Sequence, residues 1–173
     1  MPKIVTARRK EDERDRARQY LKSRLMLPTI PLGMVTLLAG YGDMAVMWIQ
    51  DELTPRALLG STVLFACGAA WGWGHARYER YLVTACPDYL ARKQRLLDAA
   101  KEYKRVKRDV PAAGPLHPGR RIVLVLYVVG LFTQGGLTLY YLGQLGAYAA
   151  IFLPWAGYFN AKVIYWRDLF TRP

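Results

Sequence analysis

The stretch "IVLVLYVVGLFTQGGLTLYYLGQLGAYAAIFLPWAGYFNA", Ile122 to Ala161, decides the fold of this chain. It has no charged residue in 40 positions. A helix crosses a bilayer core of about 30 Å with roughly 20 mainly apolar residues. The stretch therefore predicts two transmembrane helices joined by the turn Gly143-Gln144-Leu145-Gly146. A soluble domain of 173 residues has no interior that would hide such a run.

Two further apolar runs extend this interpretation. Residues 57–76 carry no charge, and Asp43 is the only charged residue between Leu25 and Gln50. We therefore expect an all-α integral membrane protein with four spans in two hairpins, at roughly 26–49, 57–77, 122–142 and 147–166. The alternative is a soluble helical protein with unusually long buried helices. The expected segments are a basic N-terminal arm (1–25), a first hairpin (26–77), a basic amphipathic helix with a Pro/Gly connector (78–121), a second hairpin (122–166) and a tail (167–173).

Basic residues are distributed unevenly over the segments that flank these spans. The chain holds 25 Lys and Arg against 13 Asp and Glu, a net charge of +12. Of the 25, only Arg56 lies in the loop between the first two spans, and the other 24 lie in the termini and the 77–121 region. Short loops rich in Lys and Arg stay on the cytoplasmic side of a membrane. Both termini and the 78–121 loop are therefore expected to face the bacterial cytoplasm or the mitochondrial matrix. Because topology explains the charge, we expect no nucleic-acid partner.

Two charged segments are expected to form helices outside the spans. "ARRKEDERDRARQYLKSRL", residues 7–25, is rich in helix formers and predicts a solvated helix. "PDYLARKQRLLDAAKEYKRVKRD", residues 87–109, predicts an amphipathic basic helix, because Tyr89, Leu96 and Tyr103 recur every seven residues. This helix is suited either to an anionic membrane surface or to a partner subunit.

The segment "WGWGHARYERY", residues 71–81, marks the expected inner end of the second span. Trp and Arg at such positions anchor helices in the head-group layer. We expect anionic phospholipid to contact the Trp and Arg side chains at this level, namely Trp71, Trp73, Arg77, Arg80, Arg92, Arg95, Arg105, Arg120 and Arg121. His75 is interpreted as a boundary residue that water satisfies, and the alternative is an axial ligand to a haem or a chlorin. We expect no haem, chlorin or metal ion.

Polar and small residues inside the spans are the remaining candidates. Asp43 and Gln134 are polar groups at membrane depth, which are often functional. For Asp43 the alternatives are an ion or proton relay, a packing role, or an outer-rim position open to water. Lys162 is expected to reach water from the end of the fourth span. Gly68-x-x-x-Gly72 and Gly157-x-x-x-Ala161 are patterns of small residues that allow close helix packing.

The sequence holds no recognisable catalytic constellation. No carboxylates are paired at membrane depth, no His/Cys/Asp cluster has metal-ligand spacing, and no glycine-rich phosphate loop is present. We therefore expect that the protein is not an enzyme. The first hypothesis is an accessory subunit of a larger membrane complex, respiratory or photosynthetic and so tied to electron transport, which braces core subunits and binds anionic lipid. The alternative is a homo-oligomeric pore or small transporter that uses Asp43 and Gln134.

Overall fold

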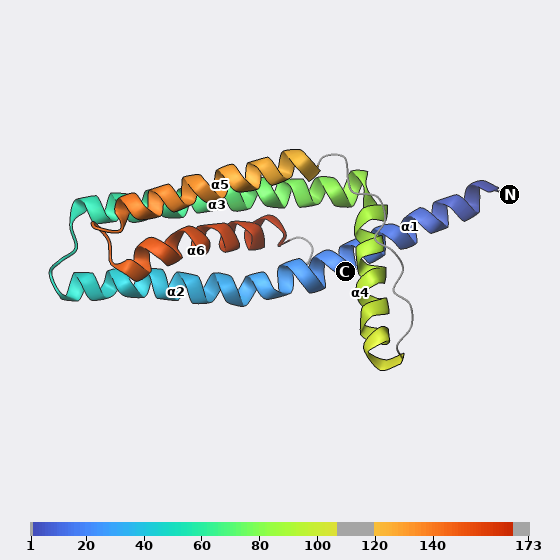
Figure 1. Ribbon diagram of the computed structural model, residues 1–173, viewed down its shortest axis with the longest axis horizontal. Helices are drawn as coiled ribbons and strands as arrows, with labels where there is room; N and C mark the ends of the chain where they lie inside the picture. The colour runs from blue at the N-terminus through green and yellow to red at the C-terminus, as the bar shows by residue number, and fades with distance from the viewer. Residues whose placement is uncertain (1, 107–119, 168–173) are drawn as a thin grey trace. The chain divides into compact units, whose positions relative to one another are not determined.

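A computed structural model describes residues 2–106 and 120–167, and all regular secondary structure in them is helical (Figure 1). The elements are α1 (Pro2–Tyr20), a π-helix (Leu21–Met26), α2 (Leu27–Ile49), α3 (Pro55–Ala85), α4 (Pro87–Val106), α5 (Arg120–Tyr141) and α6 (Ala147–Tyr165). The Pro/Gly connector at 107–119 and the end of the tail, 168–173, lie outside the described residues.

Three helices in the described part of the chain are long and apolar enough to cross a membrane. They are Glu11–Ile49, Pro55–Ala85 and Val123–Tyr141. The first is a continuous run through α1, the π-helix and α2. The expected fourth span forms α6, but this helix is not among the three, because Asn160, Lys162 and its Tyr and Trp residues lower its apolar character.

The chain divides into two compact units. One consists of Met1–Leu25 and Arg77–Arg120, and the other of Met26–Ala76 and Arg121–Pro173. α3 contributes its last nine residues, 77–85, to the former and the rest to the latter. We call the former the charged unit and the latter the apolar unit. The charged unit contains twenty Lys and Arg and nine Asp and Glu, so it carries +11 of the net charge of +12.

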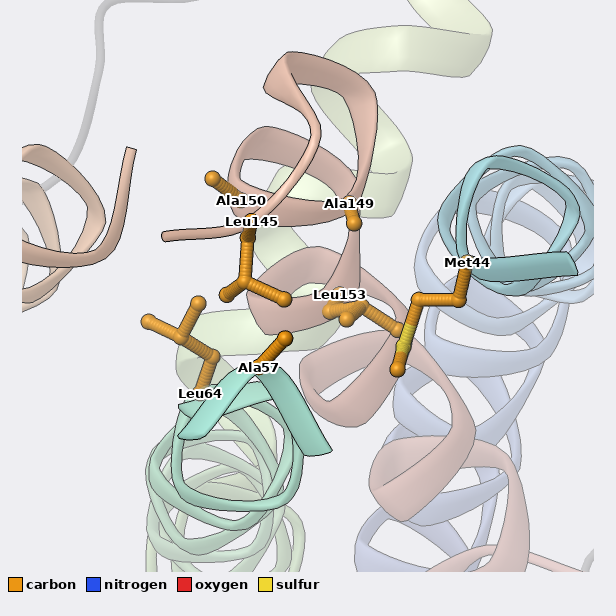
Figure 2. Packing of buried hydrophobic residues seen from close by; sticks show 7 residues of the cluster. All are labelled: Met44, Ala57, Leu64, Leu145, Ala149, Ala150 and Leu153. Atoms are coloured by element: carbon orange, nitrogen blue, oxygen red, sulfur yellow. The ribbon is translucent and has the colours of Figure 1, made fainter. Parts of the chain in front are cut away.

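α6 is the central helix of the apolar unit. It runs along α2, and Figure 1 shows it between α2 and the paired α3 and α5. Small and apolar side chains from three helices and from the turn before α6 form the core (Figure 2), namely Met44, Ala57, Leu64, Leu145, Ala149, Ala150 and Leu153. α6 contributes Ala149, Ala150 and Leu153 to this core, and the two small alanine side chains let neighbouring helices come close to it.

Glycines determine how closely α3 approaches α6. A Cβ added at Gly68 would clash with the backbone carbonyl of Pro154, and one at Gly72 with the backbone of Tyr158. From the other side, a Cβ at Gly157 would clash with the carbonyl oxygen of Phe65. These atoms belong to backbone and cannot rotate away. The three glycines therefore allow a backbone-to-backbone contact that any other residue would prevent.

The end of α2 is closed by a Schellman motif, a pair of backbone hydrogen bonds that stops the helix. The N–H of Glu52 donates to the carbonyl of Met47 at 2.9 Å, and the N–H of Asp51 donates to that of Trp48 at 3.2 Å. Asp51 has φ 58°, in the left-handed region. Glycine is the usual residue there, although Asp tolerates the conformation better than most.

In the charged unit, α1 packs against α4. The buried apolar side chains come from α1, the first residue of the π-helix, the end of α3 and α4, namely Ala17, Leu21, Leu82, Val83, Leu90 and Ala91. On α4 the buried face is centred on Leu90, Ala91 and Gln94. Tyr89 and Leu96, which the sequence suggested as the centre of the apolar stripe, are only half-buried. The side chain of Tyr103 lies outside the described residues.

Candidate functional site

Four polar side chains from three helices converge in the apolar unit. His75 comes from α3, Tyr127 from α5, and Tyr158 and Lys162 from successive turns of α6. Nδ1 of His75 lies 2.5 Å from the hydroxyl of Tyr158. The imidazole is thus hydrogen-bonded inside the protein. We call these four residues the His75 cluster.

Tyr127 completes the connection between α5 and the other two helices. Its hydroxyl lies 3.2 Å from Nδ1 of His75 and 3.2 Å from the hydroxyl of Tyr158. Its ring meets the imidazole edge-on, with the centroids 5.0 Å apart. The side chain of Tyr127 is 39% exposed, whereas Tyr158 is 7% exposed. The cluster therefore runs from the interior of the unit to its surface.

Lys162 is the buried charged end of the cluster. From the sequence we expected this side chain to reach water. It is only 4% exposed and does not extend to the surface. Nζ lies 3.4 Å from Nδ1 of His75 and 5.5 Å from the ring centroid of Tyr158. Burying an ammonium group in an apolar bundle is costly unless polar or aromatic groups surround it. His75 and Tyr158 supply such groups.

Aromatic rings pack on one side of the cluster. The ring of Trp71 lies 5.4 Å from that of Tyr158, 5.6 Å from that of Tyr127 and 6.2 Å from that of Trp155. A Cβ at Gly130 of α5 would meet the Trp71 indole at 2.7 Å, so the absence of a side chain there makes room for the ring. Aromatic contacts of this kind fix the positions of the polar groups beside them.

This arrangement joins titratable groups in a chain of contacts. Imidazole and phenol groups both donate and accept hydrogen bonds, so a proton can pass along such a series. The same contacts also hold α3, α5 and α6 in one register, since an unpaired polar group in an apolar interior costs free energy. The cluster is therefore suited to specific packing and to proton exchange.

Asp43 lies at the opposite end of α6 and does not belong to the cluster. Its carboxylate accepts a hydrogen bond from the backbone N–H of Ala149 at 2.8 Å. Ala149 is the third residue of α6, and Gly146 before the helix provides no capping side chain. A carboxylate at this position satisfies a free N–H and interacts favourably with the helix dipole. This geometry corresponds to the packing alternative for Asp43.

Gln134 is the only buried residue of α5 among those whose side chains are described. It is 8% exposed, and its amide nitrogen has no hydrogen-bond partner among the described residues. Asp43 lies on α2 and Gln134 on α5, and no hydrogen bond joins these two described side chains. The two residues form no common site in the structure. The geometry therefore gives no support to the pore alternative, which relied on both of them.

The other residues singled out from the sequence have varied surroundings. Trp73 is half-exposed and packs edge-on against Tyr165 at 6.3 Å. Ala161 is half-buried on α6. The arginines with described side chains are all exposed, namely Arg77, Arg80, Arg92, Arg95 and Arg121. Arg105 lies in α4 and Arg120 begins α5, but their side chains fall outside the described residues. Lipid contact at these positions stays a prediction.

The sequence pointed to His75 and Lys162 separately, but not to their contact, nor to Tyr127 and Tyr158. Tyr158 and Lys162 are four residues apart, as are Trp71 and His75, so each pair lies on one face of its helix. That spacing is visible in the sequence. The sequence does not show that these two faces meet, because their contact depends on how α3 packs on α6.

Comparisons with known proteins show no relatives. No protein-family model matches the chain, and no similar protein is found among curated sequences or solved structures. Within residues 2–106 and 120–167, no group of three or more His, Cys, Asp or Glu side chains is placed to hold a metal ion.

Proposed function

We propose that the protein is a non-catalytic accessory subunit of a larger membrane complex. In this proposal α2, α3, α5 and α6 cross a bacterial cytoplasmic or mitochondrial inner membrane as two hairpins. Both termini and the 78–121 loop face the cytoplasm or matrix, and the complex is respiratory or photosynthetic. The excess of basic residues in the charged unit supports this orientation.

The main support for the proposal is the exposure of the outer surface of α5 and the two glycines on it. Most of its described side chains are exposed, and Gly135 and Gly136 lie on that surface. A Cβ added at either glycine would meet no atom within 4 Å. Lipid chains pack as well against large apolar side chains, whereas small residues permit close approach of another helix. Gly135 and Gly136 therefore fit a helix from a neighbouring subunit.

Anionic phospholipid is the second expected partner. Exposed arginines next to the apolar helices, Arg77, Arg80 and Arg121, are suited to lipid phosphates at head-group depth. Lipid at these positions would seal the contact between this chain and its neighbours. Nucleic acid is not part of the proposal, because membrane topology accounts for the positive charge.

Native electrophoresis of gently solubilised source membranes, followed by mass spectrometry of the band that holds this chain, tests the proposal. We expect other membrane subunits in that band at fixed stoichiometry. Gly136→Leu should release the chain from the complex, because the larger side chain blocks the approaching helix. Val128→Leu, on an exposed part of the same helix, is the matched control. A chain that migrates alone or only with itself would refute the proposal.

The His75 cluster favours a second candidate, a small proton-coupled transporter or pore. A buried lysine in contact with His75 is the kind of intramembrane group that proton pathways use. Proton flux into liposomes that contain the purified chain tests this candidate. Flux that is lost in Lys162→Met and His75→Phe, but retained in Tyr148→Phe, would support it over the accessory role.

A further inference from the structure

α4 has a second face, besides its buried one, on which two basic side chains are exposed. Tyr89, Arg92, Lys93 and Leu96 are spaced i, i+3, i+4 and i+7, so they share one side of the helix. Arg92 and Lys93 are exposed, and Tyr89 and Leu96 are half-buried. The ammonium group of Lys93 lies 4.7 Å from the centroid of the Tyr89 ring. We call these four residues the outer face of α4.

The composition of the outer face is typical of a protein interface. Tyr and Arg are enriched where proteins bind one another, because they combine apolar area with hydrogen-bonding groups. Here one aromatic and one aliphatic side chain flank two cations. The charged unit around them carries a net charge of +11, so long-range attraction favours an acidic partner.

The described side chains of the outer face offer a small apolar area for membrane insertion. Helices that lie in a membrane surface bury a broad stripe of Trp, Phe and Leu. Leu90 and Ala91 are buried in the charged unit, so among the described side chains of α4 the outer face offers one Leu and one Tyr. Asp88 is exposed at the start of the same helix and would be repelled by anionic lipid.

We propose that the outer face of α4 is a docking site for an acidic protein surface, one that offers carboxylates to Arg92 and Lys93 and a shallow apolar contact to Tyr89 and Leu96. The proposal deepens the accessory role and rests on it, since the partner belongs to the same membrane complex. The partner is the extramembrane part of a neighbouring subunit or a protein bound to it on the same side.

Site-specific photo-crosslinking of the full chain in its own membranes tests this inference. A benzoylphenylalanine side chain at position 96 should crosslink to one protein, at a peptide rich in Asp and Glu. The same probe at Gln19, an exposed position on α1, is the control. The double change Arg92→Glu and Lys93→Glu should reduce the yield at position 96 about tenfold, as should a rise in salt, because both weaken charge pairing. Arg18→Glu makes the same kind of charge change on α1 and should have no such effect.

Each other outcome refutes the inference. Adducts of lipid at position 96 would assign the outer face to the membrane, and adducts of nucleic acid or of a second copy of this chain would assign it to those partners. No adduct, or a protein adduct that charge reversal does not reduce, would also overturn it. Native electrophoresis of the same membranes separates the two proposals: an intact complex without a crosslink refutes the docking site alone, and a chain that migrates alone refutes both.

Discussion

The carboxylate of Asp43 in α2 caps α6 by accepting a hydrogen bond from the backbone N–H of Ala149 at 2.8 Å. The two residues are 106 positions apart in the chain. A Cβ at Gly146 would clash with this carboxylate, so the glycine that precedes α6 makes room for a cap from another helix. The one acidic residue in the first apolar run thus has a structural partner.

Removing this cap should destabilise the bundle. We expect Asp43→Ala to lower the free energy of unfolding by about 1 kcal/mol, the usual cost of losing a capping side chain. Asp43→Asn should cost less, because its amide oxygen still accepts the bond. Unfolding of the purified protein by SDS, followed by circular dichroism, measures both, with exposed Glu52→Ala as the control. A stable Asp43→Asn protein that has lost ion flux would instead indicate a relay.

The close contact of α3 with α6 should not tolerate a methyl group. Gly68→Ala forces a side chain into the backbone of Pro154, and strain of this kind typically costs about 1–3 kcal/mol. Gly74→Ala is the matched control, because a Cβ there meets no atom within 4 Å. Alanine in that open position should stabilise the helix by roughly 0.5–1 kcal/mol. Equal effects of the two changes on SDS unfolding would contradict the close contact of α3 with α6.

The hydrogen bond between His75 and Tyr158 should appear as a coupling energy. We expect His75→Phe and Tyr158→Phe to show a coupling of about 0.6 kcal/mol in a double-mutant cycle, the average for hydrogen bonds between membrane helices. The cycle is measured from the SDS unfolding of the four proteins. His75→Phe combined with Tyr148→Phe, an exposed tyrosine on the same helix as Tyr158, should show additive effects.

The turn after α2 offers a stabilising substitution. Asp51→Gly should raise the free energy of unfolding by roughly 0.5–1 kcal/mol, because glycine adopts positive φ without the clash of a Cβ. Asp51→Ala should lower stability, since alanine has no side-chain oxygen to favour this conformation. A thermal unfolding scan in mild detergent distinguishes the two variants. Destabilisation by glycine would indicate that the Asp51 carboxylate has a role of its own.

The charged unit should depend on the buried face of α4. Leu90 is 3% exposed, and Leu90→Ala should cost roughly 2–5 kcal/mol of local stability. The α1–α4 pair contains many Lys and Arg residues, so its opening should increase the rate of trypsin cleavage in the intact protein. Leu59→Ala makes the same change at a side chain that is 69% exposed in the apolar unit. Cleavage that is equally fast in both variants would refute the packing of α4 on α1.

Several features could be predicted from residue patterns because each depends on a short segment. Apolar runs of about 20 residues need a helix to pair their backbone groups in lipid, whatever the neighbouring residues are. The small residues at Gly68, Gly72 and Gly157 indicated positions of close helix approach, although the sequence did not show which backbone lies opposite each of them.

The period of α4 predicted an amphipathic helix, but its buried face lies on Leu90 and Ala91 and not on Tyr89 and Leu96. Three helices meet the length and composition of a span, and α6 does not.

By itself, the sequence determined that the chain is helical, where its longest apolar helices lie and where its positive charge accumulates. Only the tertiary structure decided that Lys162 is buried beside His75, that Tyr127 and Tyr158 join them, and that Asp43 caps α6. The physical reason is the distance along the chain over which each kind of interaction acts. Helix formation and charge segregation depend on residues a few positions apart, whereas these contacts depend on the rotation and depth at which separate helices pack. That geometry follows from the sum of many weak contacts, which no single segment contains.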